Sequence, residues 1–275
     1  FQISLNIIVM YAMVHAKLFS EEKSPVYILS ANLIFSDIVQ ISLHLFFFAP
    51  AAFFQEFFLP SSIKSQAMDV IDTIMLYAWY FQTLSHIFVA VNRLAVVVFS
   101  QYSIFTRNRV IGLSIVQHIL SIAMAIGAQF FLPCCRITFI PRVFTYSYLR
   151  KEGVTNYAAM FDIPFNSTAS LTPLIAYSTI AYVMNVANRR AGLTTNKKEY
   201  AFAIQFAIMA AVYTCVWVTI RVFPILLSGT EKMYLYGITT CFAFCNLSSN
   251  AVVFLLNNSE IRRSLRSIRT GLPIA

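Results

Sequence analysis

Four polar residues interrupt sequence stretches that are otherwise apolar, and they are the first candidates for chemistry. Asn6, Asp37, Arg93 and Asn250 each lie within such a stretch or at its end. A charged or amide side chain is costly in an apolar environment and marks a functional candidate there. A lone carboxylate such as Asp37 must either take up a proton or find hydrogen-bond donors. For Arg93, the alternative to a functional role is an arginine that extends its guanidinium toward a polar interface.

A second group of residues could form a ligand site. Asp72, Met75 and Trp79 are separated by three and four positions, a spacing that places them on one face of a helix. Arg221 lies one turn before Pro224 in another apolar stretch, and this proline can kink a helix and supply a pivot. Asp72 and Arg221 could bind a polar ligand, or they could pair with each other. The residues alone leave both interpretations open.

Motifs of enzymatic or metal chemistry are missing from the sequence. It contains no Walker motif, no His-Glu-x-x-His motif and no nucleophile elbow. His44, His86 and His118 fall in three different apolar stretches without a shared metal-ligand spacing, so packing or hydrogen bonding is their expected role. The five cysteines form no Cys-x-x-Cys pair. We therefore expect no catalytic residue, no metal site and no enzyme.

The composition explains why polar residues are so scarce. Of the 275 residues, 59% are hydrophobic and only 11% are charged, and Phe alone contributes 26. A soluble globule could not cover that much apolar surface with its polar residues. These proportions exclude disorder, a nucleic-acid-binding domain and a secreted disulfide scaffold. The apolar runs are continuous rather than alternating, which favours a polytopic helical membrane protein over a β-barrel.

The apolar runs predict seven membrane-spanning helices. A spanning helix needs about 20 mostly apolar residues, and all the runs but the first, which is shorter, reach that length. No internal repeat of the kind found in transporters is visible. The predicted spans cover Phe1–His15, Val26–Phe54, Met68–Phe99, Val110–Leu132, Tyr157–Ala187, Glu199–Leu227 and Met233–Leu256.

Positive charge gathers on alternate connectors between these spans, within a net charge of +9. One set of connectors, with the C-terminal tail, holds Lys17, Lys23, Arg107, Arg109, Arg189, Arg190, Lys197, Lys198, Arg262, Arg263, Arg266 and Arg269. The other set holds Lys64, Arg136, Arg142, Arg150, Lys151 and Lys232. Lys and Arg are enriched on the cytoplasmic side of membrane proteins, so we expect an extracellular N-terminus and a cytoplasmic C-terminus. Seven spans agree with this orientation.

The chain divides into a membrane domain over residues 1–257 and a cytoplasmic tail over residues 258–275. Within the tail, Ser259–Ile268 predicts a short amphipathic helix in which Ile261, Leu265 and Ile268 share one face. Four arginines surround that face. Such a helix is typical of segments that lie in the membrane interface, so membrane lipid is an expected partner.

Three short motifs resemble those of rhodopsin-like seven-helix G-protein-coupled receptors. Residues 32–37 read Asn-Leu-Ile-Phe-Ser-Asp, residues 92–94 read Asn-Arg-Leu in place of an acidic-Arg-aromatic triplet, and residues 250–254 read Asn-Ala-Val-Val-Phe in place of Asn-Pro-x-x-Tyr. The segments 86–98, 102–105 and 197–205 are similar to nematode serpentine chemoreceptors of the classes lettered x and v. The resemblance covers nearly the whole chain.

The resemblance implies coupling to a heterotrimeric G protein through Asn92, Arg93 and Leu94. In an open state Arg93 would face a groove and cap the carbonyl groups of an inserted helix C-terminus, a favourable position for a cation. Asn92 cannot supply the usual acidic partner of this arginine. We therefore expect a less restrained resting state with higher basal activity.

The resemblance also implies that Asn6, Asp37 and Asn250 converge within the membrane as a hydrated polar switch, with a structural sodium ion possible near Asp37. The alternative is a protonated Asp37 that is hydrogen-bonded to neighbouring helices. Receptors for amines carry their ligand-binding Asp 18 positions before the arginine that matches Arg93, where this chain has Met75. A monoamine ligand is therefore disfavoured.

One departure from the family concerns its disulfide. The cysteine expected 25 positions before Arg93 is Met68 here, so the usual bond to the second outer connector cannot form. Cys134 and Cys135 are then left without an obvious partner, unless one lies N-terminal to the sequence given.

The residues and the resemblance together predict an all-α, rhodopsin-like seven-helix bundle with a short amphipathic C-terminal helix. Its expected function is that of a plasma-membrane chemoreceptor that binds a small molecule between helices and activates a heterotrimeric G protein. Nucleic acid is not an expected partner, and the sequence indicates neither the ligand, the G-protein class nor the oligomeric state. The alternative function is that of a membrane transporter or ligand-gated channel, for which repeats and broken helices would be expected.

Overall fold

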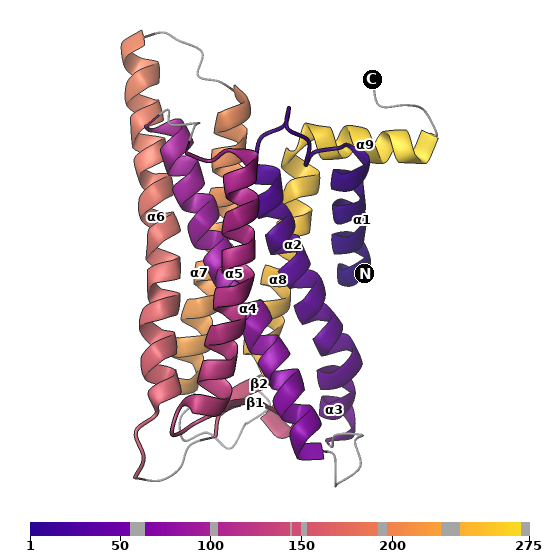
Figure 1. Ribbon diagram of the computed structural model, residues 1–275, viewed down its shortest axis with the longest axis vertical. Helices are drawn as coiled ribbons and strands as arrows, with labels where there is room; N and C mark the ends of the chain where they lie inside the picture. The colour runs from indigo at the N-terminus through magenta and orange to yellow at the C-terminus, as the bar shows by residue number, and fades with distance from the viewer. Residues whose placement is uncertain are drawn as a thin grey trace.

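Helices run along the length of the molecule, and a two-stranded hairpin closes one end (Figure 1). The computed structural model describes residues 1–55, 64–99, 104–143, 145–149, 153–191, 197–226 and 237–270. Its elements are α1 (Gln2–His15), α2 (Val26–Leu43), η1 (His44–Phe48), α3 (Ala49–Phe54), α4 (Lys64–Val97), α5 (Arg107–Ile126), η2 (Gly127–Phe131), β1 (Ile137–Ile140), η3 (Pro141–Val143), β2 (Thr145–Tyr148), α6 (Tyr157–Ala191), α7 (Lys197–Leu226), α8 (Gly237–Asn257) and α9 (Ser259–Thr270). We call the end with β1 and β2 the hairpin end, and the end with α9 the tail end.

The predicted seven-helix bundle is confirmed. Within the described residues, six helical segments are long and apolar enough to cross a membrane, and α1 is a shorter apolar helix beside them. Large apolar side chains such as Ile119, Leu174 and Tyr182 are exposed on the outside of the bundle. This outward apolar surface is what a helix bundle presents to lipid, because lipid tails are as apolar as the protein interior.

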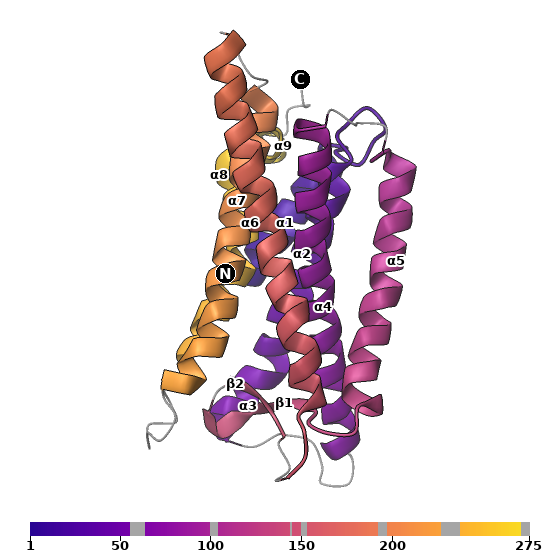
Figure 2. The ribbon, with the colours of Figure 1, turned by 90° about the vertical axis from the view of Figure 1, so that its left-hand side faces the viewer.

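α4 lies at the centre of the bundle and contacts α2, α5, α6 and α7 (Figures 1 and 2). α8 packs against α1, α2 and α7 on one side of it, whereas α5 packs against α4 on the other. A side chain at any height of α4 therefore faces several partner helices. This arrangement allows one helix to connect sites at the two ends of the molecule.

The second span departs from α-helical geometry over His44–Phe48, where the turns widen into a π-helix. Pro50 follows directly and has no backbone N–H to donate, so the regular pattern of hydrogen bonds cannot continue through it. The widened segment places His44 and Phe48 against Tyr146 of β2, with ring centroids 6.1 and 5.2 Å away. The proline thereby helps to connect this span to the hairpin.

The hairpin lies across the end of the bundle. β1 and β2 are antiparallel, and Ile137 pairs with Tyr148 while Ile140 pairs with Thr145. Phe139 points into a buried apolar cluster that includes Phe48. The strands contact α4 and α8, so the hairpin covers the space between these helices.

A disulfide joins Cys134 and Cys135 just before β1. The two cysteines are adjacent and both are buried, and Cys135 has a positive φ of 82°. Neither cysteine has an obvious partner in the sequence; the structure shows that they bond to each other. The bond therefore ties no helix to the hairpin, unlike the family disulfide that Met68 excludes.

The amphipathic helix predicted after the last span is confirmed as α9. Ile261 is fully buried, and the Ser264 hydroxyl donates to the carbonyl of Ala12 at 3.0 Å. α9 therefore packs onto the end of α1 as well as lying across the bundle (Figure 1). Its four arginines are exposed: Arg262, Arg263, Arg266 and Arg269.

Candidate functional site

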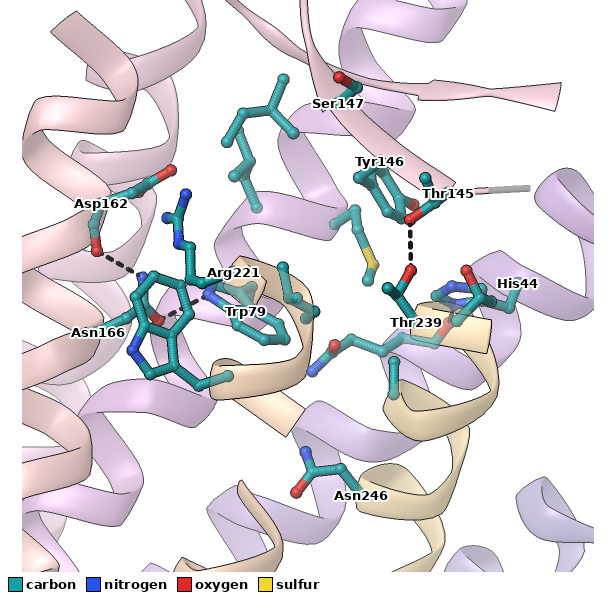
Figure 3. A pocket seen from close by; sticks show the side chains of 18 of the residues that line it. His44, Trp79, Thr145, Tyr146, Ser147, Asp162, Asn166, Arg221, Thr239 and Asn246 are labelled. Atoms are coloured by element: carbon teal, nitrogen blue, oxygen red, sulfur yellow. Dashed lines mark hydrogen bonds between the residues drawn. The ribbon is translucent and has the colours of Figure 1, made fainter. Parts of the chain in front are cut away.

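A cavity of about 150 Å³ lies inside the bundle next to the hairpin (Figure 3). Residues of α2, η1, α4, α6, α7, α8 and both strands form its walls. Three of the four residues predicted for a ligand pocket line it, namely Met75, Trp79 and Arg221. The remaining lining combines apolar side chains with a few polar groups, the composition typical of small-molecule sites.

Asp162 of α6 is a buried acceptor on one side of the cavity. Its Oδ1 accepts a hydrogen bond from the Tyr80 hydroxyl at 2.6 Å, and its Oδ2 accepts one from the Tyr148 hydroxyl at 2.8 Å. Burial and the nearby Asp162 carboxylate raise the pKa of Tyr148, which lies in the hairpin. The Tyr148 hydroxyl therefore keeps its proton at neutral pH and remains a donor to Asp162.

Asn166 lies one turn further along α6 and orients the indole of Trp79. Its Oδ1 accepts from Trp79 Nε1 and from the Tyr213 hydroxyl, both at 3.0 Å. Its Nδ2 donates to the carbonyl of Asp162 at 2.9 Å. Trp79 thus presents an apolar ring to the cavity while its N–H is already bonded (Figure 3).

Arg221 is the cation of the cavity wall. Its guanidinium lies over the Trp217 ring, 4.1 Å from the centroid, and Nη2 donates to the Tyr148 hydroxyl at 3.3 Å. Nε is buried and has no hydrogen-bond partner among the described residues. Because Tyr148 in turn donates to Asp162, the hydroxyl bridges the arginine and the carboxylate.

Asp72, the fourth predicted pocket residue, lies elsewhere. It is buried, and its Oδ2 accepts a hydrogen bond from the Thr138 hydroxyl of β1 at 2.6 Å. Asp72 does not line the cavity, and the pairing with Arg221 that the sequence left open is not the contact observed. The helical spacing correctly placed Asp72 near Met75 and Trp79, but its height on α4 brings it under the hairpin instead.

A chain of amide side chains connects the cavity to Asp37. Gln40 and Asn246 line the cavity, and their side-chain N–H groups donate to Gln82 Oε1 at 3.2 and 3.4 Å. Gln82 Nε2 donates to Asp37 Oδ1 at 2.6 Å, and Asn250 Nδ2 donates to Asp37 Oδ2 at 2.8 Å. Asp37 is fully buried, and both of its oxygens therefore accept hydrogen bonds from amides.

Asn6 belongs to the edge of this region rather than to the predicted cluster around Asp37. Its Nδ2 donates to the carbonyls of Gln2 and Leu247, at 3.1 and 3.2 Å. The structure thus brings Asp37 and Asn250 together as predicted, whereas Asn6 ties α1 to α8. Its contact with α8 lies one turn from Asn250.

The sodium ion considered near Asp37 stays a prediction. Metal cations of this kind take oxygen ligands such as carboxylates, carbonyls and water. Here Gln82 and Asn250 both turn amide N–H groups toward the carboxylate. A cation at Asp37 would therefore compete with these two donors for the carboxylate oxygens.

Arg93 lies at the tail end of α4 and points into the bundle. Its side chain is 1% exposed, and Nε and Nη2 both donate to Asn92 Oδ1, at 3.2 and 2.9 Å. The guanidinium also lies 5.5 Å from the ring centroid of Phe202 of α7. Leu94 packs against the apolar cluster of Ile180. The inward position argues against an arginine that simply extends to the membrane surface.

A second hollow, of about 300 Å³, opens beside Arg93 at the tail end. Asn92, Arg93 and Arg107 line it, together with the turn before α2. Below this turn, Glu260 of α9 accepts from Lys23 Nζ at 3.3 Å and from the Tyr27 hydroxyl at 2.7 Å. Lys23 and Tyr27 are thus both bonded to the same carboxylate of α9.

The expected kink residue, Pro224, lies in the last turn of α7, which ends at Leu226. A pivot there would act next to Arg221 and the cavity. The hinge role of Pro224 stays a prediction.

The sequence matches the family described as "Serpentine type 7TM GPCR chemoreceptor Srx" over residues 1–257. The chain belongs to this family. The finding confirms the resemblance to the class lettered x and places the protein in a family of receptors. No curated protein sequence matches the chain.

The fold of the receptor is similar to that of squid rhodopsin. The superposition has a TM-score of 0.73 and covers 96% of this chain and 77% of the rhodopsin chain, at 15% sequence identity. At so low an identity, the likeness shows the fold alone. It supports the rhodopsin-like seven-helix architecture of this serpentine receptor.

Several residues of the receptor's cavity and of the amide chain beside it were not found from the sequence. Asp162 and Gln82 lie in apolar spans, so the rule that singled out Asp37 would have singled out both if it had been applied evenly. Tyr148 could not be singled out in this way, because it lies in a connector, where polar residues are common. It reaches Asp162 only when the hairpin folds over the bundle.

Proposed function

We propose that this receptor is a plasma-membrane chemoreceptor that binds a small molecule in the cavity and activates a heterotrimeric G protein at the tail end. The observation that carries the proposal is the position of α7 between the two sites. At one end of α7, Arg221 and Trp217 line the cavity. Near its other end, Phe202 lies against the guanidinium of Arg93.

The coupling between the two sites follows from these contacts. A ligand that replaces some of the present contacts of Arg221 or Trp217 with its own favours a different position of α7 relative to α4. A shift of α7 at the tail end moves Phe202 away from Arg93 and exposes the guanidinium to a partner helix. The ligand supplies the energy for this change only through its different affinities for the two positions of α7.

The amide chain provides a second contact between the cavity and the interior. Gln40 and Asn246 line the cavity and donate to Gln82, which donates to Asp37. A ligand that moves either amide alters the partners of Asp37 and hence its bond to Asn250. In this proposal Asp37 and Asn250 form the polar switch, and Asn6 acts through its bond to the Leu247 carbonyl.

The proposed orientation places the hairpin end outside the cell and the tail end in the cytoplasm, so that the N-terminus is extracellular. Its support is the positive charge at the tail end, where α9 alone carries four exposed arginines. Such a cluster also attracts the anionic lipids of the cytoplasmic leaflet. Residues 258–275 would thus form a membrane-associated tail to the receptor domain of residues 1–257.

Reconstitution tests the proposal. Receptor in lipid nanodiscs with a purified heterotrimeric G protein should accelerate nucleotide exchange when a panel of small odorants is added. The cavity-filling variant Met75→Trp should abolish the response while the protein still folds. Ligand-driven solute or ion flux in proteoliposomes, without nucleotide exchange, would instead support the transporter or channel.

A further inference from the structure

We propose that the cavity selects neutral carbonyl compounds, such as ketones, aldehydes and esters on a hydrocarbon skeleton, and that Arg221 Nε donates the hydrogen bond that recognises the carbonyl oxygen. This inference rests on the proposed function, because it names the ligand class of the same cavity. It depends on which polar groups of the cavity wall already have partners and on the charges there.

Most donors on this side of the cavity are already engaged. Trp79 Nε1 donates to Asn166, the Tyr148 hydroxyl donates to Asp162, and Arg221 Nη2 donates to Tyr148. Arg221 Nε is different, because it is buried and has no partner among the described residues. A buried donor without an acceptor is costly, so a ligand that supplies an acceptor oxygen recovers that free energy on binding.

The charges of the wall favour a neutral acceptor over an anionic one. Arg221 and Asp162 both line the cavity, and the Tyr148 hydroxyl bridges them. The positive charge of the arginine is therefore already balanced by a carboxylate. A ligand carboxylate would add a second negative charge in an apolar space, where an unbalanced charge is strongly disfavoured.

A cationic ligand is disfavoured by the same side chains. Each oxygen of Asp162 already accepts a hydrogen bond from a tyrosine hydroxyl, so this carboxylate is a weaker partner for an ammonium group than an unpaired acid is. The guanidinium of Arg221 would also repel an ammonium group. Met75 also stands at the position where amine receptors carry their ligand-binding aspartate.

The rest of the wall suits a hydrocarbon skeleton. Met75, Leu76, Ile137, Ile220 and Leu247 line the cavity, and the indole rings of two tryptophans add flat apolar surface. Such a wall gains free energy from the apolar area that it removes from water, in proportion to the length of the skeleton. The carbonyl then orients the molecule, while the skeleton provides most of the affinity.

Matched probe compounds test the inference. We would use 2-heptanone, heptane, 2-aminoheptane and heptanoate, with the corresponding shorter and longer members of each class, on receptor in nanodiscs. Binding is measured as the shift in melting temperature, and signalling as nucleotide exchange on the G protein. The ketones should bind at least about tenfold more tightly than the alkanes, since a hydrogen bond to a charged donor contributes that much.

Variants of Arg221 separate this role from general damage to the cavity. Arg221→Leu should remove the preference for ketones over alkanes and leave alkane binding in place. Arg221→Gln, which keeps a neutral N–H donor, should retain part of the preference and serves if the leucine variant fails to fold. Arg136→Leu removes an arginine of the hairpin end that pairs with Asp69 outside the cavity, and it should leave the preference unchanged.

The outcomes distinguish this inference from the proposed function. If amines or carboxylates bind best, or if the ketone preference survives Arg221→Leu or is lost in Arg136→Leu, the ligand class is wrong while the cavity can remain the binding site. If ketones bind equally well to Met75→Trp, the cavity is not the site and the proposed function fails as well. Absence of binding by every probe class overturns the inference.

Discussion

The cavity at the hairpin end and the site around Arg93 at the tail end differ in how their buried polar groups are hydrogen-bonded. At the tail end, Arg93 donates twice to Asn92, and Glu260 accepts from Lys23 and Tyr27. At the hairpin end, the cavity wall keeps buried atoms without a partner among the described residues, namely Arg221 Nε, the Tyr146 hydroxyl and Asn246 Oδ1.

The difference matches the task we propose for each end. An unpaired buried donor favours the binding of a ligand that can satisfy it, because the free energy is recovered on binding. A paired charge favours a closed state that must be released by movement of a neighbouring element. The hairpin end is thus prepared for a small ligand, whereas the tail end must change shape before it can accept a protein.

Loss of the buried arginine should have the largest effect on signalling. We expect Arg93→Leu to reduce ligand-stimulated nucleotide exchange to the basal level, because Arg93 is the residue that faces the inserted helix in the proposed open state. Ligand binding should change by no more than about twofold, since distant sites contribute almost independently.

The matched control at the same end is Arg107→Leu. Arg107 lines the same hollow, but its side chain is 38% exposed and its ion pair with Glu21 is long, at 3.5 Å. Exchange should persist in this variant. Equal loss of exchange in both variants would mean that overall positive charge, and not the buried position of Arg93, determines coupling.

Between the two ends, Asp37→Ala should cause the largest loss of stability. The substitution leaves the buried N–H groups of Gln82 and Asn250 without their acceptor, which should lower the free energy of unfolding by about 3 kcal/mol. Thermal melting of purified receptor measures the change. Asp69→Ala breaks a partly exposed salt bridge with Arg136 and should cost less than about 1 kcal/mol. Similar losses in both variants would show that the amide chain is not a stabilising core.

Two neighbouring tyrosines of the hairpin sharpen the contrast between paired and unpaired groups. Tyr148→Phe deprives Asp162 of one donor and should lower the free energy of unfolding by about 1.5 kcal/mol. Tyr146→Phe removes a hydroxyl that has no partner among the described residues and should change stability by less than about 0.5 kcal/mol. Melting of the two variants side by side measures the difference, and a larger cost for Tyr146→Phe would contradict the assignment of partners.

A smaller effect is expected when the contact between Arg93 and Asn92 at the tail end is strengthened. Asn92→Asp turns the neutral acceptor of Arg93 into a carboxylate, so an ion pair replaces hydrogen bonds in which only the donor is charged. Ligand-free nucleotide exchange should fall by about fivefold, which corresponds to about 1 kcal/mol. Unchanged exchange in ligand-free membranes would show that Asn92 does not restrain the resting state.

Sodium should have the smallest effect. Because amide N–H groups occupy both oxygens of Asp37, we expect the midpoint of ligand-stimulated exchange to be the same in sodium chloride and in choline chloride at equal ionic strength. A sodium-dependent shift that is larger in Gln82→Ala than in the unchanged receptor would show that the glutamine competes with the ion for Asp37.

The sequence by itself determined the architecture of this receptor. The lengths of the apolar runs predicted the helices, the placement of Lys and Arg predicted which connectors share an end, and the pattern of Ser259–Ile268 predicted α9. Each of these signals is local, because a spanning helix satisfies its own backbone hydrogen bonds and needs only sufficient apolar length. The inward positions of Asp37 and Arg93 were predictable as well, because an ionisable side chain is costly when it faces lipid.

Only the tertiary structure decided which polar groups meet. Asp37 bonds to Gln82, Asp72 lies under Thr138, and Asp162 collects two tyrosine hydroxyls from different elements. In a membrane bundle the outer face of a helix is as apolar as the inner one, so the apolar pattern does not reveal which face turns inward. The rotation and height of each helix, and the fold of the hairpin over the bundle, follow from packing among all of them.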